Sequence, residues 1–269
     1  MPQQAGARTA ESIMSDSERI AKIVDELSQA VAEVLARNEV DREQYREGVQ
    51  FLARVQAERE IPLLVDLFIE HLVVKAEDKR GRNSSQAIQG PYFIEDVPWV
   101  SGALKVSPED NGEPLMIRGR VTAPNGAPIE GATVHIWHST PDGAYTGFHK
   151  GMSADLYRGR VRSAADGTFQ VATTMPVPYT IPDQGPVGGL LSMMGRHCWR
   201  PAHVHFKLRA DGYRDLTTQS YFAGGKWVDD DCAGGIVDDL IFAPVLEDGK
   251  KVLQIDFVLD FARSAAEAA

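Results

Sequence analysis

The sequence lacks three features that whole classes of protein require: many cysteines, long apolar runs and an excess of positive charge. Its two cysteines, Cys198 and Cys232, lie far apart, which excludes a disulfide scaffold and a thiolate zinc site. The longest apolar run, 61–74, contains Asp66 and Glu70 and is shorter than the roughly 18–20 residues of a membrane span. The formal charge of −10 argues against binding to nucleic acid or an anionic membrane.

These absences leave an enzyme or a binding protein of the cytoplasm. Residues 1–15 are polar and lack the apolar core of a secretory signal, so they predict a flexible tail. Apolar residues at helical spacing then predict helices over 17–35, 41–60 and 61–78,. Ser15 or Asp16 with Glu18 is a typical N-terminal cap for the first helix. These helices indicate either a dimer interface and pocket wall or a helical cap on the rest of the chain.

After about residue 100 the apolar period changes from 3.6 to 2, which is typical of short strands separated by turns. We therefore predict a mainly β protein, an antiparallel β-sandwich core with an N-terminal α-helical domain. The expected domains are a tail at 1–15, a helical domain and linker at 16–100, and the sandwich at 101–269. The predicted strands are 115–122, 133–139, 158–163, 168–173, 203–209, 217–222 and 252–259.

One segment, 175–200, holds several prolines and glycines together with apolar residues such as Tyr179, Met193 and Met194. It cannot form a regular strand, and long loops in compact domains are usually functional. Its apolar content predicts that it folds down over the sandwich, where a site would lie.

Two histidines, His203 and His205, stand two residues apart in the predicted strand PAHVHFKL. They project from one face of that strand, and neutral imidazole is the commonest nitrogen ligand of metals. The pair indicates either part of a metal site or a half-buried pair joined by hydrogen bonds.

Two loop tyrosines, Tyr145 in PDGAY and Tyr179 in PVPY, offer oxygen ligands. A phenol with a pKa near 10 binds as phenolate only to a strong Lewis acid. Two phenolates with two imidazoles favour ferric iron over zinc, copper or magnesium. Taken singly, each tyrosine is equally typical of a packing residue.

The block 119–235 resembles the intradiol ring-cleavage dioxygenases, in particular the catechol 1,2-dioxygenase and chlorocatechol 1,2-dioxygenase group. The resemblance extends upstream to QGPYFIEDVP and, more loosely, to the helical third. The matching segments are GRV, GATVHIWHSTPDGAY, PVPY with DQGPVG, GRHCWRPAHVHFKL and LTTQSYF followed by DDDC.

This resemblance implies an enzyme that uses O₂ to cleave catechol or a substituted catechol between its hydroxylated carbons, giving a cis,cis-muconate. Arg200 would stabilise charge on the ring, Gln219 would orient ligands or substrate, and Tyr179 would also act as a base. The implied cofactor is Fe(III), with Tyr145, Tyr179, His203 and His205 as its ligands.

By position in the motifs, the resemblance also places the substrate pocket and the partners. It implies a homodimer through the N-terminal helices, in some members with a lipid-like molecule bound. The expected substrate-binding residues are Asp66, Leu67, Ile88, Pro91, Tyr92, Arg200, Cys232 and Ala233.

Three alternatives remain open from the sequence. Hydroxyquinol differs from catechol by one small group, so a hydroxyquinol 1,2-dioxygenase of the same family is one. A cupin-like metal enzyme is another, although no Glu follows His205 at the expected spacing. The third is a non-catalytic β-sandwich binding module, which leaves Tyr145, Tyr179 and Arg200 unexplained.

Overall fold

A computed structural model describes residues 15–148 and 151–262 of the chain. The chain divides into two compact units, and the boundary between Ala53 and Arg54 falls inside a helix. The predicted flexible tail lies outside the described residues except for Ser15, and the expected three-part domain division stays a prediction.

The first unit contains α1 (Asp16–Arg37) and most of α2 (Arg42–Ala57). Ser15 caps α1 as predicted, because its hydroxyl accepts the Glu18 N–H at 3.3 Å while the Glu18 carboxylate accepts the Ser15 N–H at 2.8 Å,. No residue of α1 is buried. Its apolar stripe is exposed over Ile20, Ile23, Val24, Leu27, Val31, Val34 and Leu35.

The helical part of the second unit follows the predicted span 61–78. It consists of α3 (Ile61–Val65), the π-helical segment η1 (Asp66–Glu70) and α4 (His71–Asp78). The π-helical turn was not predicted, because one extra residue in a turn leaves the apolar pattern almost unchanged. Leu63 and Leu67 are buried. No helix in the described ranges is long and apolar enough to cross a membrane.

The strands confirm the predicted set and correct its pairing. The segment predicted as one strand at 252–259 is divided into β11 and β12, and both pair parallel with β1, as β9 does with β8. The sheets are therefore mixed rather than purely antiparallel, and helix and strand take similar shares of the chain. The main strands are β1 (Pro114–Thr122), β2 (Thr133–His138), β3 (Arg158–Arg162), β4 (Thr168–Thr174), β7 (His203–Arg209), β8 (Leu216–Phe222), β9 (Ile241–Phe242), β10 (Val245–Glu247), β11 (Lys250–Gln254) and β12 (Phe257–Val258).

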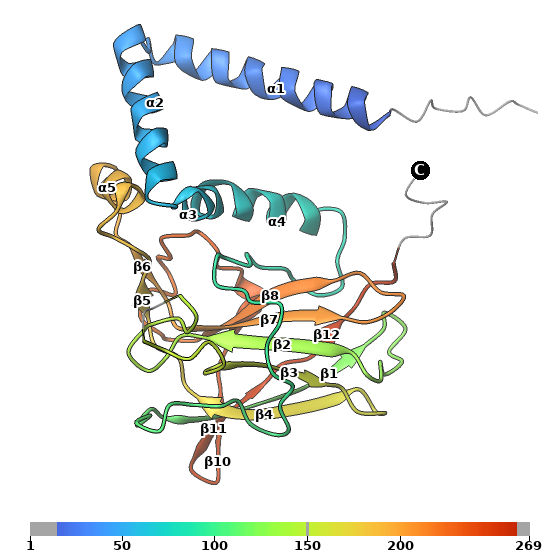
Figure 1. Cartoon of the computed structure of the whole chain (residues 1–269). Helices are drawn as coiled ribbons and strands as arrows, with labels where there is room; N and C mark the ends of the chain where they lie inside the picture. The colour runs from blue at the N-terminus through green and yellow to red at the C-terminus, as the bar shows by residue number, and fades with distance from the viewer. Residues whose placement is uncertain (1–14, 149–150, 263–269) are drawn as a thin grey trace, which may run out of the picture. The chain divides into compact units, whose positions relative to one another are not determined.

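Two sheets enclose the core of the second unit. One has the order β10-β11-β1-β12 with β4 beside β1, and the other has the order β3-β2-β7-β8-β9. Ile117 of β1 and Val171 of β4 meet Val134 of β2 and Val204 and Phe206 of β7 in one fully buried cluster. Figure 1 shows α3 and α4 on the β7–β8 side of this unit and the β10–β11 hairpin on the opposite side.

Because side chains alternate along a strand, the inward direction of Val204 and Phe206 turns His203 and His205 to the outer face of their sheet. The segment 175–200 was predicted to fold over the sandwich, and it covers this face only in part. It contains β5 (Tyr179–Thr180), α5 (Pro186–Met193) and β6 (Trp199–Arg200). Leu191 is buried, whereas Met193 and Met194 are 78% and 50% exposed, so part of the segment's apolar content faces solvent.

Candidate metal and substrate site

A row of side chains crosses three neighbouring strands on the outer face of the β3-β2-β7-β8-β9 sheet. Trp137 of β2 lies opposite His205 of β7, and His205 lies opposite Gln219 of β8. One step along, His203 lies opposite Tyr221. Each of these side chains is at most 2% exposed, so the strand register itself builds a buried polar row.

Four candidate donor groups converge at this row. The Nε2 atoms of His203 and His205 are 3.0 Å apart, and the Tyr145 hydroxyl is 3.3 Å from His203 Nε2. The Tyr179 hydroxyl shares side-chain hydrogen bonds with Tyr145 and Arg200. The structure therefore brings together all four residues that the sequence suggested as ligands.

Local backbone geometry delivers the two tyrosines. Tyr145 follows a turn in which Gly143 has φ +83°, and a Cβ at Gly143 would lie 3.1 Å from Cβ of Tyr179. Glycine is therefore needed both for the left-handed conformation and for the close approach of the two segments. Tyr179 stands opposite Arg200 in the β5–β6 pair, which explains how a proline-rich segment holds it in place.

Burial sets the protonation states of these groups. Burial, with a smaller contribution from Arg200, lowers the pKa of His203 to about 3, and burial together with His203 lowers the pKa of His205 well below its usual value. Both imidazoles are thus neutral near pH 7 and carry a free lone pair. His203 Nδ1 lies 2.8 Å from the Pro201 carbonyl oxygen, so it carries the proton and leaves the Nε2 lone pair directed at the cluster. Burial raises the pKa of Tyr145 and of Tyr179, while Arg200 opposes that rise.

Arg200 is the charged side chain that the sequence placed beside the candidate metal ligands, and the structure adds its partner. Its guanidinium donates to both carboxylate oxygens of Asp231, at 3.0 and 2.9 Å, and the side chains are 4% and 1% exposed. Burial alone would lower the pKa of Arg200, but Asp231 together with Tyr179 and Tyr221 outweighs this and raises the pKa. The guanidinium also reaches Gln219 Oε1 at 3.4 Å and the Tyr221 hydroxyl at 3.3 Å.

The expected pocket walls are placed unequally. The Tyr92 ring stacks on Tyr145 with centroids 4.3 Å apart, and the Ile88 carbonyl accepts the Gln219 amide at 2.6 Å. Cys232 and Ala233 are buried beside Asp231, whose carboxylate accepts the Ala233 N–H at 3.1 Å. Among the described residues no contact joins the cluster to Asp66, Leu67 or Pro91, so their place in the pocket stays a prediction.

Four residues of the site were missed by sequence reasoning: Trp137 of the buried row, Tyr221, Asp231 and Glu70. Tyr221 was within reach, because it follows Gln219 at the alternation of a strand. Asp231 is the last of three consecutive aspartates, and nothing in the sequence distinguishes it. Glu70 of η1 accepts the N–H groups of Gln89 at 2.6 Å and Gly90 at 3.3 Å, and so fixes the segment that carries Ile88 and Tyr92.

The donor set fits a metal ion. Two ligand atoms each about 2.0–2.1 Å from a metal and 90–110° apart lie about 2.9–3.4 Å from each other, which is the spacing found here. Within the described ranges no group of three or more His, Cys, Asp and Glu side chains could hold a metal. The other donors that converge on His203 and His205 are the phenols of Tyr145 and Tyr179, and phenolate oxygen suits a hard, highly charged ion.

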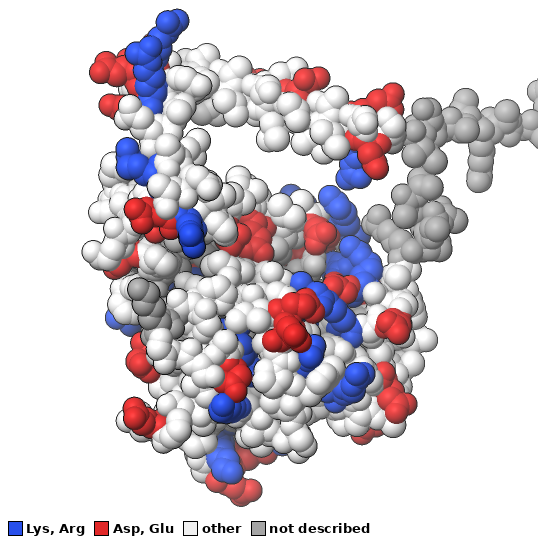
Figure 2. All heavy atoms as spheres, viewed as in Figure 1, with Lys and Arg blue, Asp and Glu red and all other residues white. Residues whose placement is uncertain are grey.

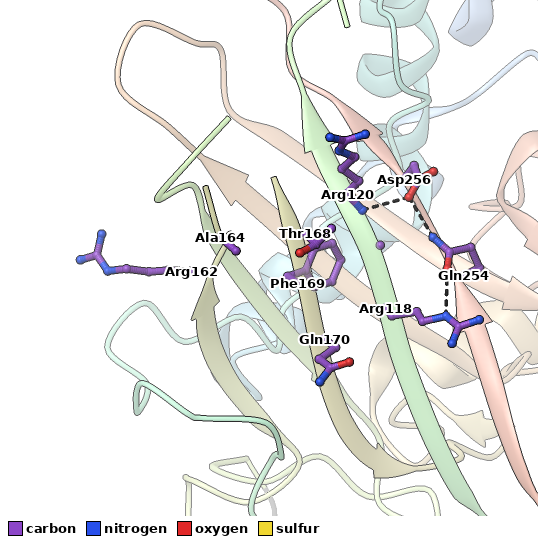
Figure 3. A pocket seen from close by; sticks show the side chains of 10 residues that line it. Arg118, Arg120, Arg162, Ala164, Thr168, Phe169, Gln170, Gln254 and Asp256 are labelled. Atoms are coloured by element: carbon purple, nitrogen blue, oxygen red, sulfur yellow. Dashed lines mark hydrogen bonds between the residues drawn. The ribbon is translucent and has the colours of Figure 1, made fainter. Parts of the chain in front are cut away.

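A separate hollow lies on the other sheet. It encloses about 690 Å³ and is lined in part by Arg118, Arg120, Gln254 and Asp256, as Figure 3 shows. Arg118 already donates to Glu247 at 2.7 Å and to Gln254 at 3.1 Å, so its charge is satisfied within the protein. No predicted site residue lines this hollow. Figure 2 shows acidic and basic side chains interspersed on the face in view, in keeping with a surface that presents no basic patch there.

Comparison with known proteins agrees with this geometry. Residues 17–84 match the family model described as the catechol dioxygenase N terminus, and residues 88–261 match the dioxygenase model. The chain is 47% identical to a chlorocatechol 1,2-dioxygenase of Pseudomonas putida over 90% of this chain and 93% of that protein. The crystal structure of a chlorocatechol 1,2-dioxygenase from Pseudomonas putida aligns with a TM-score of 0.87, covering 90% of this chain and 98% of that one. A hydroxyquinol 1,2-dioxygenase of a Rhizobium strain is 28% identical over 93% of this chain and 90% of its own.

Proposed function

Because the chain belongs to the intradiol ring-cleavage dioxygenases, we propose a ferric iron site at the buried cluster and assign its residues to the reaction. The protein is an oxidoreductase that uses O₂ to open the ring of catechol or a substituted catechol between its hydroxylated carbons, giving a cis,cis-muconate. For the substituent we propose chlorine. A relative named for hydroxyquinol is 28% identical and one named for 6-chlorohydroxyquinol is 35% identical, against 47% for one named for chlorocatechol.

The observation that carries the iron proposal is the convergence of two neutral imidazoles and two phenols in one dry cluster. His203, His205, Tyr145 and Tyr179 would hold the ion through Nε2 and hydroxyl oxygen atoms. When bound, ferric iron supplies Lewis acidity and accepts electron density from the diol. Everything else in the reaction has to come from the chain and the substrates.

The residues around the cluster have distinct tasks in this proposal. Tyr179, as phenolate, would take a proton from one diol hydroxyl at its oxygen, since its hydroxyl already exchanges hydrogen bonds with Tyr145 and Arg200. Arg200 would stabilise negative charge that develops on the ring, because its guanidinium is buried, fixed by Asp231 and 3.3 Å from His203 Nε2,. Gln219 would orient the substrate-side segment through its bond to the Ile88 carbonyl,.

The substrate pocket is proposed to lie between two walls. Ile88, Pro91 and Tyr92 would form one, and Cys232 and Ala233 the other, with Asp66 and Leu67 completing it. A built Cβ on Gly235 would be 3.1 Å from both Ile88 and Arg200, so the two walls meet closely near the guanidinium. Such tight packing around a planar ring would exclude water from the reacting atoms.

A homodimer through the N-terminal helices is proposed for the assembled protein. One support is the apolar stripe of α1, whose residues are 40–62% exposed. The helical part of the second unit also exposes Val65, Ile69, Leu72 and Val73, which are 45–53% exposed. Apolar areas of this kind are typical of interaction surfaces. A lipid-like molecule would be an alternative cover for the same apolar side chains.

Colour tests the iron proposal directly. Phenolate bound to Fe(III) gives a broad visible charge-transfer band, so the purified, iron-loaded protein should be red to purple. Tyr179→Phe and His205→Ala should weaken or shift the band. Tyr213→Phe removes a hydroxyl from the turn between β7 and β8 and should leave the band unchanged. A colourless protein at full iron content would refute the proposed site.

Turnover tests the substrate proposal separately. The ratio kcat/KM should be higher for 3- or 4-chlorocatechol than for hydroxyquinol, followed through the muconate product. One small group changes discrimination by about 1–3 kcal/mol, or roughly 10–200-fold. A coloured protein that prefers hydroxyquinol would refute the substrate proposal and leave the iron site standing.

A further inference from the structure

We propose that Trp137 is the positioning residue of His205: its indole holds the imidazole by stacking, where His203 is held by a hydrogen bond. The inference rests on the proposed iron site. It concerns how one ligand is kept in the orientation that the site needs.

The stack is built by strand register. Trp137 of β2 and His205 of β7 are direct cross-strand partners, so their side chains leave the same face of the sheet side by side. The two rings are nearly parallel, with centroids 4.6 Å apart and planes 6° from each other. Trp137 is 2% exposed, so both rings lie in a dry layer.

Other neighbouring residues hold the Trp137 indole in place. The Phe93 ring packs against Trp137 with centroids 5.1 Å apart at a tilt of 55°. Phe93 belongs to the segment that Glu70 fastens through Gln89 and Gly90. The Trp137 ring is therefore held rigidly enough to restrain the imidazole that stacks on it.

The two histidines differ in what holds them. The second nitrogen of His203 is bonded to the Pro201 carbonyl at 2.8 Å. The second nitrogen of His205, Nδ1, is buried, and no hydrogen-bond partner for it is found among the described residues. A ligating histidine normally has its ring orientation fixed by a hydrogen bond at that nitrogen, so His205 needs another restraint.

The surroundings of His205 leave the stack as that restraint. A Cβ built on Gly90 would lie 4.0 Å from His205 Cε1. The rings of His203 and Tyr145 meet the imidazole at steep angles of 70° and 71°, with centroids 4.6 and 6.1 Å away. Of these aromatic neighbours only Trp137 lies parallel to the imidazole and so packs against its flat face, and the χ2 torsion of histidine is soft unless the face is packed.

The test compares iron retention in purified, substrate-free protein. Trp137→Leu and Trp137→Met remove the stack and keep an apolar side chain, Trp137→Phe keeps an aromatic face, and Phe206→Leu is the matched control. Phe206 neighbours His205 on β7 but points into the core. Each variant is loaded with Fe(III), and the rate of iron loss to an excess of chelator and the visible band are recorded, with far-UV circular dichroism as a check on folding.

We expect the Leu and Met variants to lose iron about 10–100 times faster than the wild type, the range found for lost outer partners of metal ligands, with a shifted band. Trp137→Phe should restore most of the retention. Phe206→Leu should lower thermal stability while retaining iron at the wild-type rate. If a folded Leu or Met variant keeps the wild-type rate and band, the stack does not position His205. If the wild type itself binds no coloured iron, the proposed iron site fails instead.

Discussion

The buried pair of Arg200 and Asp231 allows a quantitative test of the site's electrostatics. Asp231→Asn keeps the shape of the side chain and removes its charge. The Arg200 guanidinium, whose side chain is 4% exposed, is then left charged without a counter-ion. Breaking a buried ion pair by removing one partner costs about 3–5 kcal/mol of unfolding free energy, and we expect Asp231→Asn to lie in that range.

The adjacent aspartate supplies the control. Asp230 pairs with His197 at 3.1 Å, but its side chain is 76% exposed. Exposed pairs contribute little, so Asp230→Asn should change the free energy of unfolding by less than about 0.5 kcal/mol. The double variant Arg200→Met with Asp231→Leu removes both charges, and it should recover much of the loss because no uncompensated charge remains.

The assay is urea unfolding at pH 7 and 25 °C, followed by circular dichroism at matched iron content. The same comparison at lower pH checks the sign. Burial opposes the charged form of Asp231, but Arg200, together with the Ala233 N–H and His203, outweighs burial and lowers the pKa of this carboxyl. The stabilisation is therefore present above about pH 4, the unfolded value, and is lost as the pH falls through the folded pKa. A loss below about 1 kcal/mol for Asp231→Asn at pH 7, or an equal loss for Asp230→Asn, would refute the reasoning.

Three further substitutions test other parts of the structure. Burial and the nearby Glu70 raise the pKa of Asp66 to about 6, so folding favours its neutral form. Because the Asp66 side chain is about half exposed, we expect Asp66→Asn to raise the free energy of unfolding by only about 1 kcal/mol at pH 7.5. At pH 4 the substitution should change it by almost nothing. A Cβ at Gly119 would lie 1.7 Å from the Ile255 carbonyl oxygen, whereas a Cβ at Gly189 would meet nothing within 4 Å. In thermal melts we therefore expect Gly119→Ala to be strongly destabilised and Gly189→Ala to be unchanged or slightly stabilised. Ser15→Ala removes the cap of α1 and should lower helix content in the first unit, by circular dichroism, with a cost of about 1 kcal/mol.

Local elements were predictable because their signals are local. Alternating apolar residues and Asp-Gly or Asn-Gly turns identified β1, β2, β4 and β7 to within a residue or so at each end. The pairing of β1 with β11 and β12 was not predictable, because turn residues report where a strand ends and say nothing about its partner. The gap between β11 and β12 follows from Ile255, whose carbonyl approaches Gly119, and that contact joins residues far apart in the chain.

The residues of the candidate site also divide into those predictable from local sequence and those that depend on contacts between distant segments. His203 and His205 could be identified as one face of one strand, and Tyr145 and Tyr179 through the spacing that the family resemblance recognises. Trp137 was hidden, because its role depends on the β2–β7 register that sets it opposite His205. Partners that come from register or from loop closure require the three-dimensional structure.

The charge balance of the cluster explains why phenols are needed there at all. Arg200 and Asp231 cancel each other, and His203 and His205 are neutral near pH 7 because burial lowers their pKa values. Among the described side chains of the cluster, only the phenols of Tyr145 and Tyr179 could then supply negative charge to balance a buried cation. Since burial also raises the pKa of both phenols, only a strongly polarising ion would ionise them, and a divalent ion would do so less readily than a trivalent one. The same charge balance favours a diol that can lose its protons over a neutral aromatic ring, because each ionised oxygen supplies a negative charge that the protein side chains do not.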